Sequence, residues 1–140
     1  MQAFEQKVRD SFGRQALMAT IGAQLVSVTP GAVEISLPFG RHLTQQNDFL
    51  HAGVITSILD SACGYAALSV APENAEALSV EFKVNLLAPA VGDSFVARAQ
   101  VKRAGITLTV CTADAFALNK GNEKLVATMQ ATIMNMIPRT

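Results

Sequence analysis

The residue best suited to chemistry in this chain is Asp60, a carboxylate set among small and apolar residues. If the segment is helical, the side chains one turn away on either side of Asp60 are uncharged. These neighbours are Thr56, Ser57, Cys63 and Gly64. Carboxylates are rarely buried without a partner, and an unpaired carboxylate in such surroundings suits general-base chemistry. The structural alternative is that Asp60 faces solvent, or caps local backbone together with Ser61 at an interface.

The segment before Asp60 supplies a second candidate feature, a helix start at or near Ala52-Gly53. Free N–H groups at a helix start, with the helix dipole behind them, can stabilise developing negative charge as an oxyanion hole does. Gly53 would let a ligand approach the backbone closely, whereas His51 taken alone is better explained as a capping or packing residue. Asp60 follows two turns later, about 10–12 Å along the axis. A carbonyl held at the helix start of one subunit could therefore meet the carboxylate of a facing subunit.

Other catalytic patterns are missing from the sequence. There is no Gly-x-Ser-x-Gly and no Gly-x-Gly-x-x-Gly segment. The two Cys and two His lie too far apart for a zinc motif, so we expect no metal. Cys63 and Cys111 are in apolar settings and are predicted to be small core residues. Arg98, Lys102 and Arg103 are predicted to form a solvated strand edge, with contact to an anionic ligand group as the alternative.

One long helix must position Asp60 and the helix start. The chain from Gly53 to about Val70 carries an apolar stripe at helical spacing, and Pro72 ends the element. The apolar stripe consists of Ile55, Ile58, Leu59, Ala62 and Ala66. A second face is small apart from its carboxylate and consists of Gly53, Thr56, Ser57, Asp60, Gly64 and Ala67. We expect the apolar stripe to pack on a sheet and the small face to contact a partner copy.

Strands are predicted on both sides of this helix. Pro30-Gly31 suits a type II turn between two apolar runs, and strict apolar–polar alternation predicts a strand over 78–86. The full set of predicted strands is 25–28, 32–37, 78–86, 95–103, 106–118 and 124–136. Their short connections favour an antiparallel sheet. Residues 1–18 are predicted to be an N-terminal helical segment, with Gly13 as a stop signal, and 39–50 a loop.

Composition limits the classes of protein and of partner. The chain has 140 residues, of which 50% are apolar and 16% charged, and its formal net charge is zero. This length predicts a single domain over residues 1–140. The lack of basic excess predicts no nucleic-acid partner. With no apolar run near the ~20 residues of a membrane span and no signal-peptide core, we expect a cytoplasmic protein without a membrane partner. Few charges and zero net charge favour self-association, so we expect a homo-oligomer.

The stretch from His51 to Ala67 resembles the signature of PaaI-like hotdog-fold acyl-CoA thioesterases: roughly His-Gly-Gly, six residues, then Asp or Glu, a small residue and Ala. The resemblance covers about Leu17 to Met136. It implies an α+β hotdog fold, in which an antiparallel sheet of five to six strands wraps around a long central helix. It also implies dimers, commonly paired into tetramers. The activity it implies is hydrolysis of aliphatic or aryl acyl-CoA thioesters at the dimer interface, with no cofactor beyond the coenzyme A of the substrate.

The resemblance assigns catalytic roles to residues of this chain. Asp60 matches the acidic position, as general base or as nucleophile. Ala52 and Gly53 match the two glycines, of which the first polarises the thioester carbonyl through its N–H. His51 matches the histidine that supports this loop. Ser79 falls where related enzymes place a hydroxyl near the attacking water.

Further residues are assigned to the catalytic and substrate-binding set. Gln45 stands where the family often has Asn, and its longer side chain can make the same hydrogen bonds. Asn47 is the alternative for this role, and the sequence leaves the choice between the two amides open. The expected substrate-binding residues are Asn47, Thr56, Ser79, Asn85 and Arg103.

Two other functions remain possible on the same fold. The first is a non-catalytic module that binds or senses acyl-CoA, which no residue of the chain excludes. The second is a hydratase or dehydratase that acts on acyl thioesters. Such enzymes resemble a His-Phe-Pro-Gly pattern or a set of Asn, His and Asp, and neither occurs here. We therefore rank the second alternative below the first.

Overall fold

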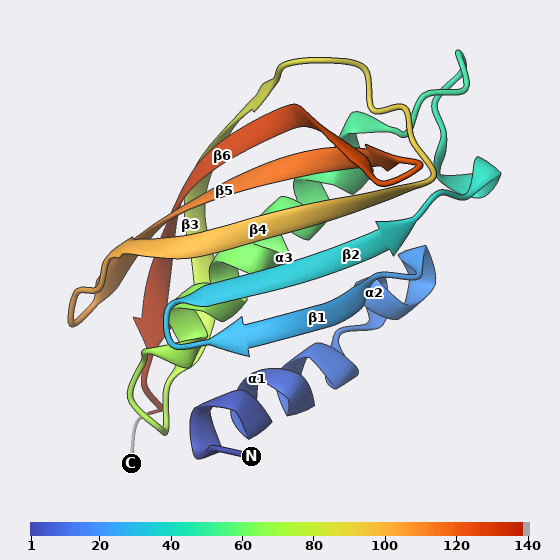
Figure 1. The fold of residues 1–140 in the computed structure, drawn as a ribbon. Coiled ribbons are helices and arrows are strands. Elements are labelled where there is room, and N and C mark those ends of the chain that lie inside the picture. The colour runs from blue at the N-terminus through green and yellow to red at the C-terminus, as the bar shows by residue number, and fades with distance from the viewer. Residues whose placement is uncertain (139–140) are drawn as a thin grey trace.

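The computed structural model describes residues 1–138, in which one antiparallel sheet wraps around one long helix (Figure 1). The helices are α1 (Ala3–Arg14), α2 (Ala16–Ile21), the short 3-10 helix η1 (Arg41–Leu43) and α3 (Ala52–Ser69). The strands are β1 (Gln24–Thr29), β2 (Ala32–Pro38), β3 (Glu76–Leu86), β4 (Ser94–Arg103), β5 (Leu108–Asn119) and β6 (Asn122–Met136). All neighbouring pairs are antiparallel. This arrangement confirms the expected sheet around a central helix.

The apolar stripe of α3 forms the centre of the core. Each of its five predicted members is at most 1% exposed, and α3 contacts all six strands of the sheet. By length and by its mean hydropathy of 1.2, α3 would also suffice for a membrane span, yet 61% of it is buried inside the fold. Its apolar character is therefore accounted for by the core of this domain.

Strand β3 has an unexpected position. The sheet order is β1-β2-β4-β5-β6-β3, so β3 pairs with β6 and the connection over residues 87–93 crosses the sheet instead of forming a hairpin. This places β3 at one edge. At the other edge, β1 is flanked by α1 (Figure 1). Four apolar side chains of β3 are about half exposed: Leu78, Val80, Phe82 and Leu86.

The N-terminal segment differs in detail from its prediction. Gly13 does not stop the first helix, because an isolated glycine is tolerated inside a helix, and α1 continues to Arg14. The break follows at Gln15, whose backbone is extended, and α2 then continues past residue 18 to end at Gly22 with a φ of 82°. The predicted loop over 39–50 contains η1 and closes with a bridge between Thr44 and Leu50.

Candidate active site

Asp60 lies in the middle of α3, on the stripe that the sheet leaves partly exposed. Its Oδ1 accepts a hydrogen bond of 2.6 Å from the Ser79 hydroxyl of β3. Ser79 faces the helix because it pairs with Ile133, whose side chain is fully buried, and cross-strand partners share a face. Over residues 1–138, Asp60 takes part in no salt bridge, and its Oδ2 has no hydrogen-bond partner. The carboxylate is thus oriented by a neutral group.

The start of α3 is capped by His51. Its Nδ1 accepts a 2.7 Å hydrogen bond from the Gly53 N–H, so a neutral His51 carries its proton on Nε2. A side chain at position 53 would lie 3.0 Å from this Nδ1. The close approach of the His51 imidazole therefore explains why position 53 is a glycine. The Gly53 N–H already donates to His51 and is not available to a ligand. The Ala52 N–H, by contrast, has no acceptor among the described residues, and it lies at the positive end of the α3 dipole.

A cavity of about 550 Å³ opens beside this helix start. Gln45 and Ala52 both line it, and Asn47 does not. The Gln45 Oε1 accepts a hydrogen bond from the Asn47 N–H, which fixes the side chain within the turn. Its Nε2 has no partner within residues 1–138. Of the two amides that the sequence left open, Gln45 is the one that lines the same cavity as Ala52.

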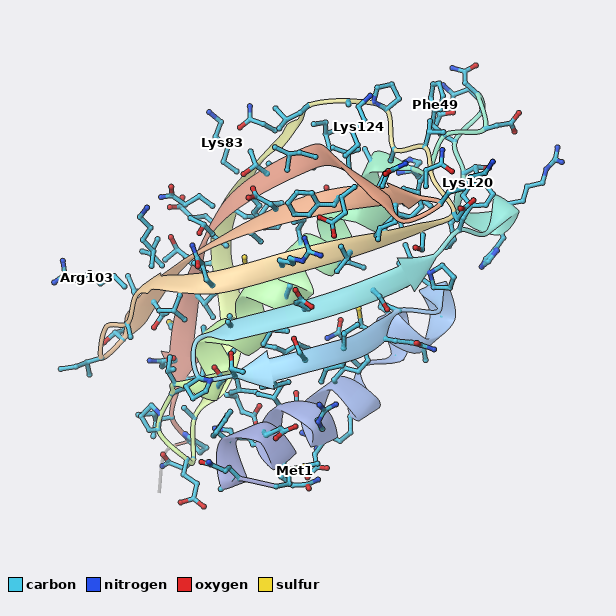
Figure 2. The ribbon with its side chains drawn as sticks, viewed as in Figure 1. Met1, Phe49, Lys83, Arg103, Lys120 and Lys124 are labelled. Atoms are coloured by element: carbon cyan, nitrogen blue, oxygen red, sulfur yellow. The ribbon has the colours of Figure 1, made fainter. Side chains whose placement is uncertain are left out.

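The remaining predicted binding residues have other surroundings. Thr56 donates a 2.8 Å hydrogen bond to the Ala52 carbonyl and so supports the first turn of α3. Asn85 lies on the outer face of the sheet, because its neighbour Val84 pairs with the buried Met129. Arg103 lies at the end of the sheet opposite to the cavity residue Phe49 (Figure 2). The structure therefore brings neither Asn85 nor Arg103 to Asp60 or Ala52 within one chain.

The two candidate features do not meet within one chain either. Asp60 and Ala52 belong to the same helix and are separated by about 12 Å along its axis, at 1.5 Å per residue. One thioester carbonyl cannot contact both groups across that distance. A second cavity of about 330 Å³ begins at Asp60 and Ser79 and extends toward the N-terminal helices. Within one chain, Ala52 and Asp60 thus line two different cavities.

The sequence did not predict a hydrogen-bond network beside Asp60 that ties α3 to the N-terminal segment. Ser61 donates to the Gln15 Oε1 at 2.9 Å, and the Gln15 Nε2 donates to the Tyr65 hydroxyl at 2.9 Å. Ser11 donates to the same hydroxyl at 3.3 Å. The only indication of this network in the sequence was the spacing of Ser11 and Gln15, which are four residues apart and would share one face of a helix. It did not reveal what that face would contact.

Other singled-out side chains have structural roles. Cys63 and Cys111 are fully buried, as expected. Burial raises the pKa of the Cys111 thiol to about 11 and raises the pKa of Cys63 as well. Arg98 forms ion pairs with Glu34 at 2.8 Å and with Glu123. Its charge is therefore already paired with carboxylates of neighbouring strands. Residues 1–138 contain no group of His, Cys, Asp and Glu arranged to hold a metal ion.

Comparison with known proteins shows which family this chain resembles. The sequence profile of the family described as "Thioesterase superfamily" matches residues 47–123. A thioesterase family protein from Silicibacter pomeroyi is 55% identical, with a TM-score of 0.95 over 96% of this chain and 99% of that one. The PaaI protein of the E. coli phenylacetic acid degradation operon shares the hotdog fold at 21% identity, with a TM-score of 0.85 over 96% and 94%. A Saccharolobus solfataricus protein named as an esterase is 28% identical over 64% of this chain, which spans 64% of that relative.

The cap at His51 can be tested by substitution. Replacing His51 with Ala removes the acceptor of the Gly53 N–H and should lower the free energy of unfolding by about 1 kcal/mol. Asn at this position also accepts at a helix N-terminus, so His51→Asn should recover most of the loss. Urea unfolding of the three proteins at one concentration measures both effects. Equal stability of the Ala and Asn variants would contradict the assigned cap.

Proposed function

This chain belongs to the thioesterase superfamily, and we propose that it hydrolyses aliphatic or aryl acyl-CoA thioesters at a site shared by two copies. One observation carries this proposal. The free Ala52 N–H and the Ser79-held Asp60 carboxylate lie on one helix but too far apart to act on one carbonyl. A two-fold axis between facing α3 helices would place the Ala52 of one copy opposite the Asp60 of the other.

The β3 edge is the proposed contact between the copies. Its backbone is unpaired on one side, and its apolar side chains are about half exposed. Exposed edges of this kind pair with further strands unless they are blocked. Antiparallel pairing of β3 with its copy is isologous, and Ser79 of β3 contacts Asp60 on the small face of α3. The pairing would therefore bring the two small faces together.

The proposed reaction needs only water and the side chains described. The Ala52 N–H and the α3 dipole would hold the thioester oxygen, with the free Gln45 Nε2 beside it. Acting as general base, Asp60 of the other copy takes a proton from water while the water oxygen bonds to the carbonyl carbon. The C–S bond then breaks, coenzyme A leaves as a thiolate, and the proton passes from Asp60 to sulfur or solvent. Direct attack by Asp60 as nucleophile is the alternative route.

Further features of the proposal rest on composition and on the resemblance. We propose a dimer of dimers, a cytoplasmic location, and no cofactor other than substrate coenzyme A. We also propose no nucleic-acid or membrane partner, given a net charge of zero and a long apolar helix that is mostly buried. A non-catalytic acyl-CoA sensor is the second candidate. It would bind acyl-CoA without release of free coenzyme A.

Turnover should depend on the carboxylate and on one backbone N–H. Asp60→Asn should lower kcat about 10²- to 10⁴-fold, as loss of a general base does. Ala52→Pro removes the N–H and should cost about 10²- to 10³-fold. Proline suits the first position of a helix. The residue before a proline must have an extended backbone, and His51 has one, with φ −62° and ψ 136°. Thiol release from a panel of acyl-CoAs measures both.

The control for this experiment is Asp10→Asn, the same substitution on the exposed part of α1. It should retain full activity, and circular dichroism should show all variants folded. A fully active Asp60→Asn variant would refute the proposed role of the carboxylate. Binding of acyl-CoA by the wild type without any coenzyme A release would favour the sensor instead.

The contact between copies can be tested at Val80, which is 55% exposed on β3. Val80→Glu places a charge at the proposed two-fold edge and should shift the protein to smaller species in sedimentation velocity. Val26→Glu is the matched control, because Val26 is 51% exposed on β1 at the other edge. It should leave the sedimentation coefficient unchanged. A Val80→Glu variant that sediments like the wild type would place the contact elsewhere.

A further inference from the structure

A third cavity adjoins the one at the start of α3. This outer cavity has a volume of about 380 Å³ and lies between the β5–β6 turn and the connection from β3 to β4. Phe49 and Pro89 line both it and the inner cavity beside Ala52, so the two spaces are neighbours. Small-ligand pockets have volumes of about 300–1,000 Å³. The outer cavity is thus large enough for a ligand group, and the proposed hydrolysis leaves it unused.

Phe49 lies at the boundary between the two cavities, and its backbone is held from both sides. Its carbonyl accepts a 2.8 Å hydrogen bond from the Gln45 N–H. The next N–H along the chain, that of Leu50, donates to the Ala90 carbonyl at 3.2 Å. The Phe49 side chain is nevertheless 37% exposed. An accessible aromatic ring on a fixed backbone is what the stacking of a planar base requires.

Two asparagines of the β5–β6 turn, Asn119 and Asn122, line the outer cavity. The turn between them is tight, with positive φ values of 51° at Lys120 and 84° at Gly121. The Lys120 N–H donates to the Asp93 carboxylate at 3.2 Å, which ties the turn to the neighbouring connection. Neither asparagine side chain makes a hydrogen bond within residues 1–138. Each amide offers a donor beside an acceptor, the pattern that pairs with the edge of adenine.

The charges at the outer cavity favour an anionic ligand group. Glu123 lines this cavity, but its carboxylate accepts a 3.0 Å hydrogen bond from the Arg98 guanidinium and is paired there. Lys124 lines the cavity and Lys120 belongs to the same turn, and neither forms a salt bridge within residues 1–138. Figure 2 shows Phe49, Lys120 and Lys124 at one end of the molecule. Unpaired ammonium groups of this kind bind phosphate as point charges.

The inner cavity has the character that the rest of coenzyme A needs. Most of its lining is apolar, including the run from Leu86 to Ala90 and Ile55 of α3. The pantetheine arm of coenzyme A is an aliphatic chain with two amides, and it suits such a wall. With the thioester carbonyl at Ala52, the arm would pass Phe49 and lead into the outer cavity.

From these observations we infer that the outer cavity binds the nucleotide end of coenzyme A, with adenine stacked on Phe49 and the phosphates at Lys120 and Lys124. The inference rests on the proposed acyl-CoA hydrolysis, because it takes the thioester carbonyl to lie at Ala52. These residues then recognise the carrier of the acyl group and not the acyl group itself. The protein selects a thioester of free coenzyme A over one on a carrier protein, whose phosphopantetheine arm has no adenine nucleotide.

The test compares acetyl and benzoyl thioesters of three carriers: coenzyme A, 4′-phosphopantetheine and pantetheine. For the wild type, kcat/KM should fall at least about tenfold from coenzyme A to pantetheine, because the stacked base and the phosphates are lost. Phe49→Leu keeps the cavity wall apolar but removes the ring, and should raise KM for the coenzyme A thioester about fivefold or more. Lys124→Gln should raise it about twofold to fivefold. Both variants should keep the wild-type kcat and the wild-type rates with pantetheine thioesters.

Phe39→Leu is the matched control for the ring, because Phe39 is 43% exposed and lines neither cavity. Arg14→Gln is the control for the charge, since Arg14 is exposed at the end of α1. Both should leave all rates unchanged. The inference is overturned if the wild type hydrolyses pantetheine thioesters as well as those of coenzyme A, or if Phe49→Leu and Lys124→Gln affect both carriers equally. Failure of the wild type to release thiol from any of the six thioesters would instead refute the proposed function.

Discussion

The structure depends on which residues of α3 are buried by the sheet and which are left exposed. Its large aliphatic residues must be removed from water, and the sheet curves around the helix to bury them (Figure 1). What remains outside the sheet is a narrow stripe of small residues with one carboxylate, Asp60. Because the stripe is small, another backbone or a ligand can approach it closely. Because it is uncharged apart from Asp60, the carboxylate has only Ser79 to orient it.

The placement of β3 gives this stripe its proposed role. The chain crosses the sheet after β3, so this strand lies at an edge beside α3 with its apolar residues half exposed. The same strand supplies Ser79 to Asp60. The surface proposed to join two copies and the hydrogen bond that orients the proposed base thus come from one element. Assembly and chemistry are expected to be lost together when this edge is altered.

Much of the fold could be predicted from the sequence because its signals are local. The apolar stripe of α3, the turn at Pro30-Gly31 and the alternation in β3 each follow from residues close in the chain. The pairing of β3 with β6 and the network from Gln15 to Tyr65 could not be predicted, because contacts between residues about fifty positions apart create them. The site was predictable as two features on one helix. The structure adds that the Ala52 N–H is free while that of Gly53 is engaged.

The central claim is that each catalytic site combines Ala52 of one copy with Asp60 of another, and mixed oligomers test it most directly. Chains carrying Asp60→Asn and chains carrying Ala52→Pro are refolded together in equal amounts, and the turnover of the unseparated mixture is measured. Each mixed dimer would contain one site with both defects and one intact site, so random reassortment should restore about a quarter of wild-type turnover. If both groups acted within a single chain, the mixture would show no more activity than the two variants measured separately, and the shared site would be wrong.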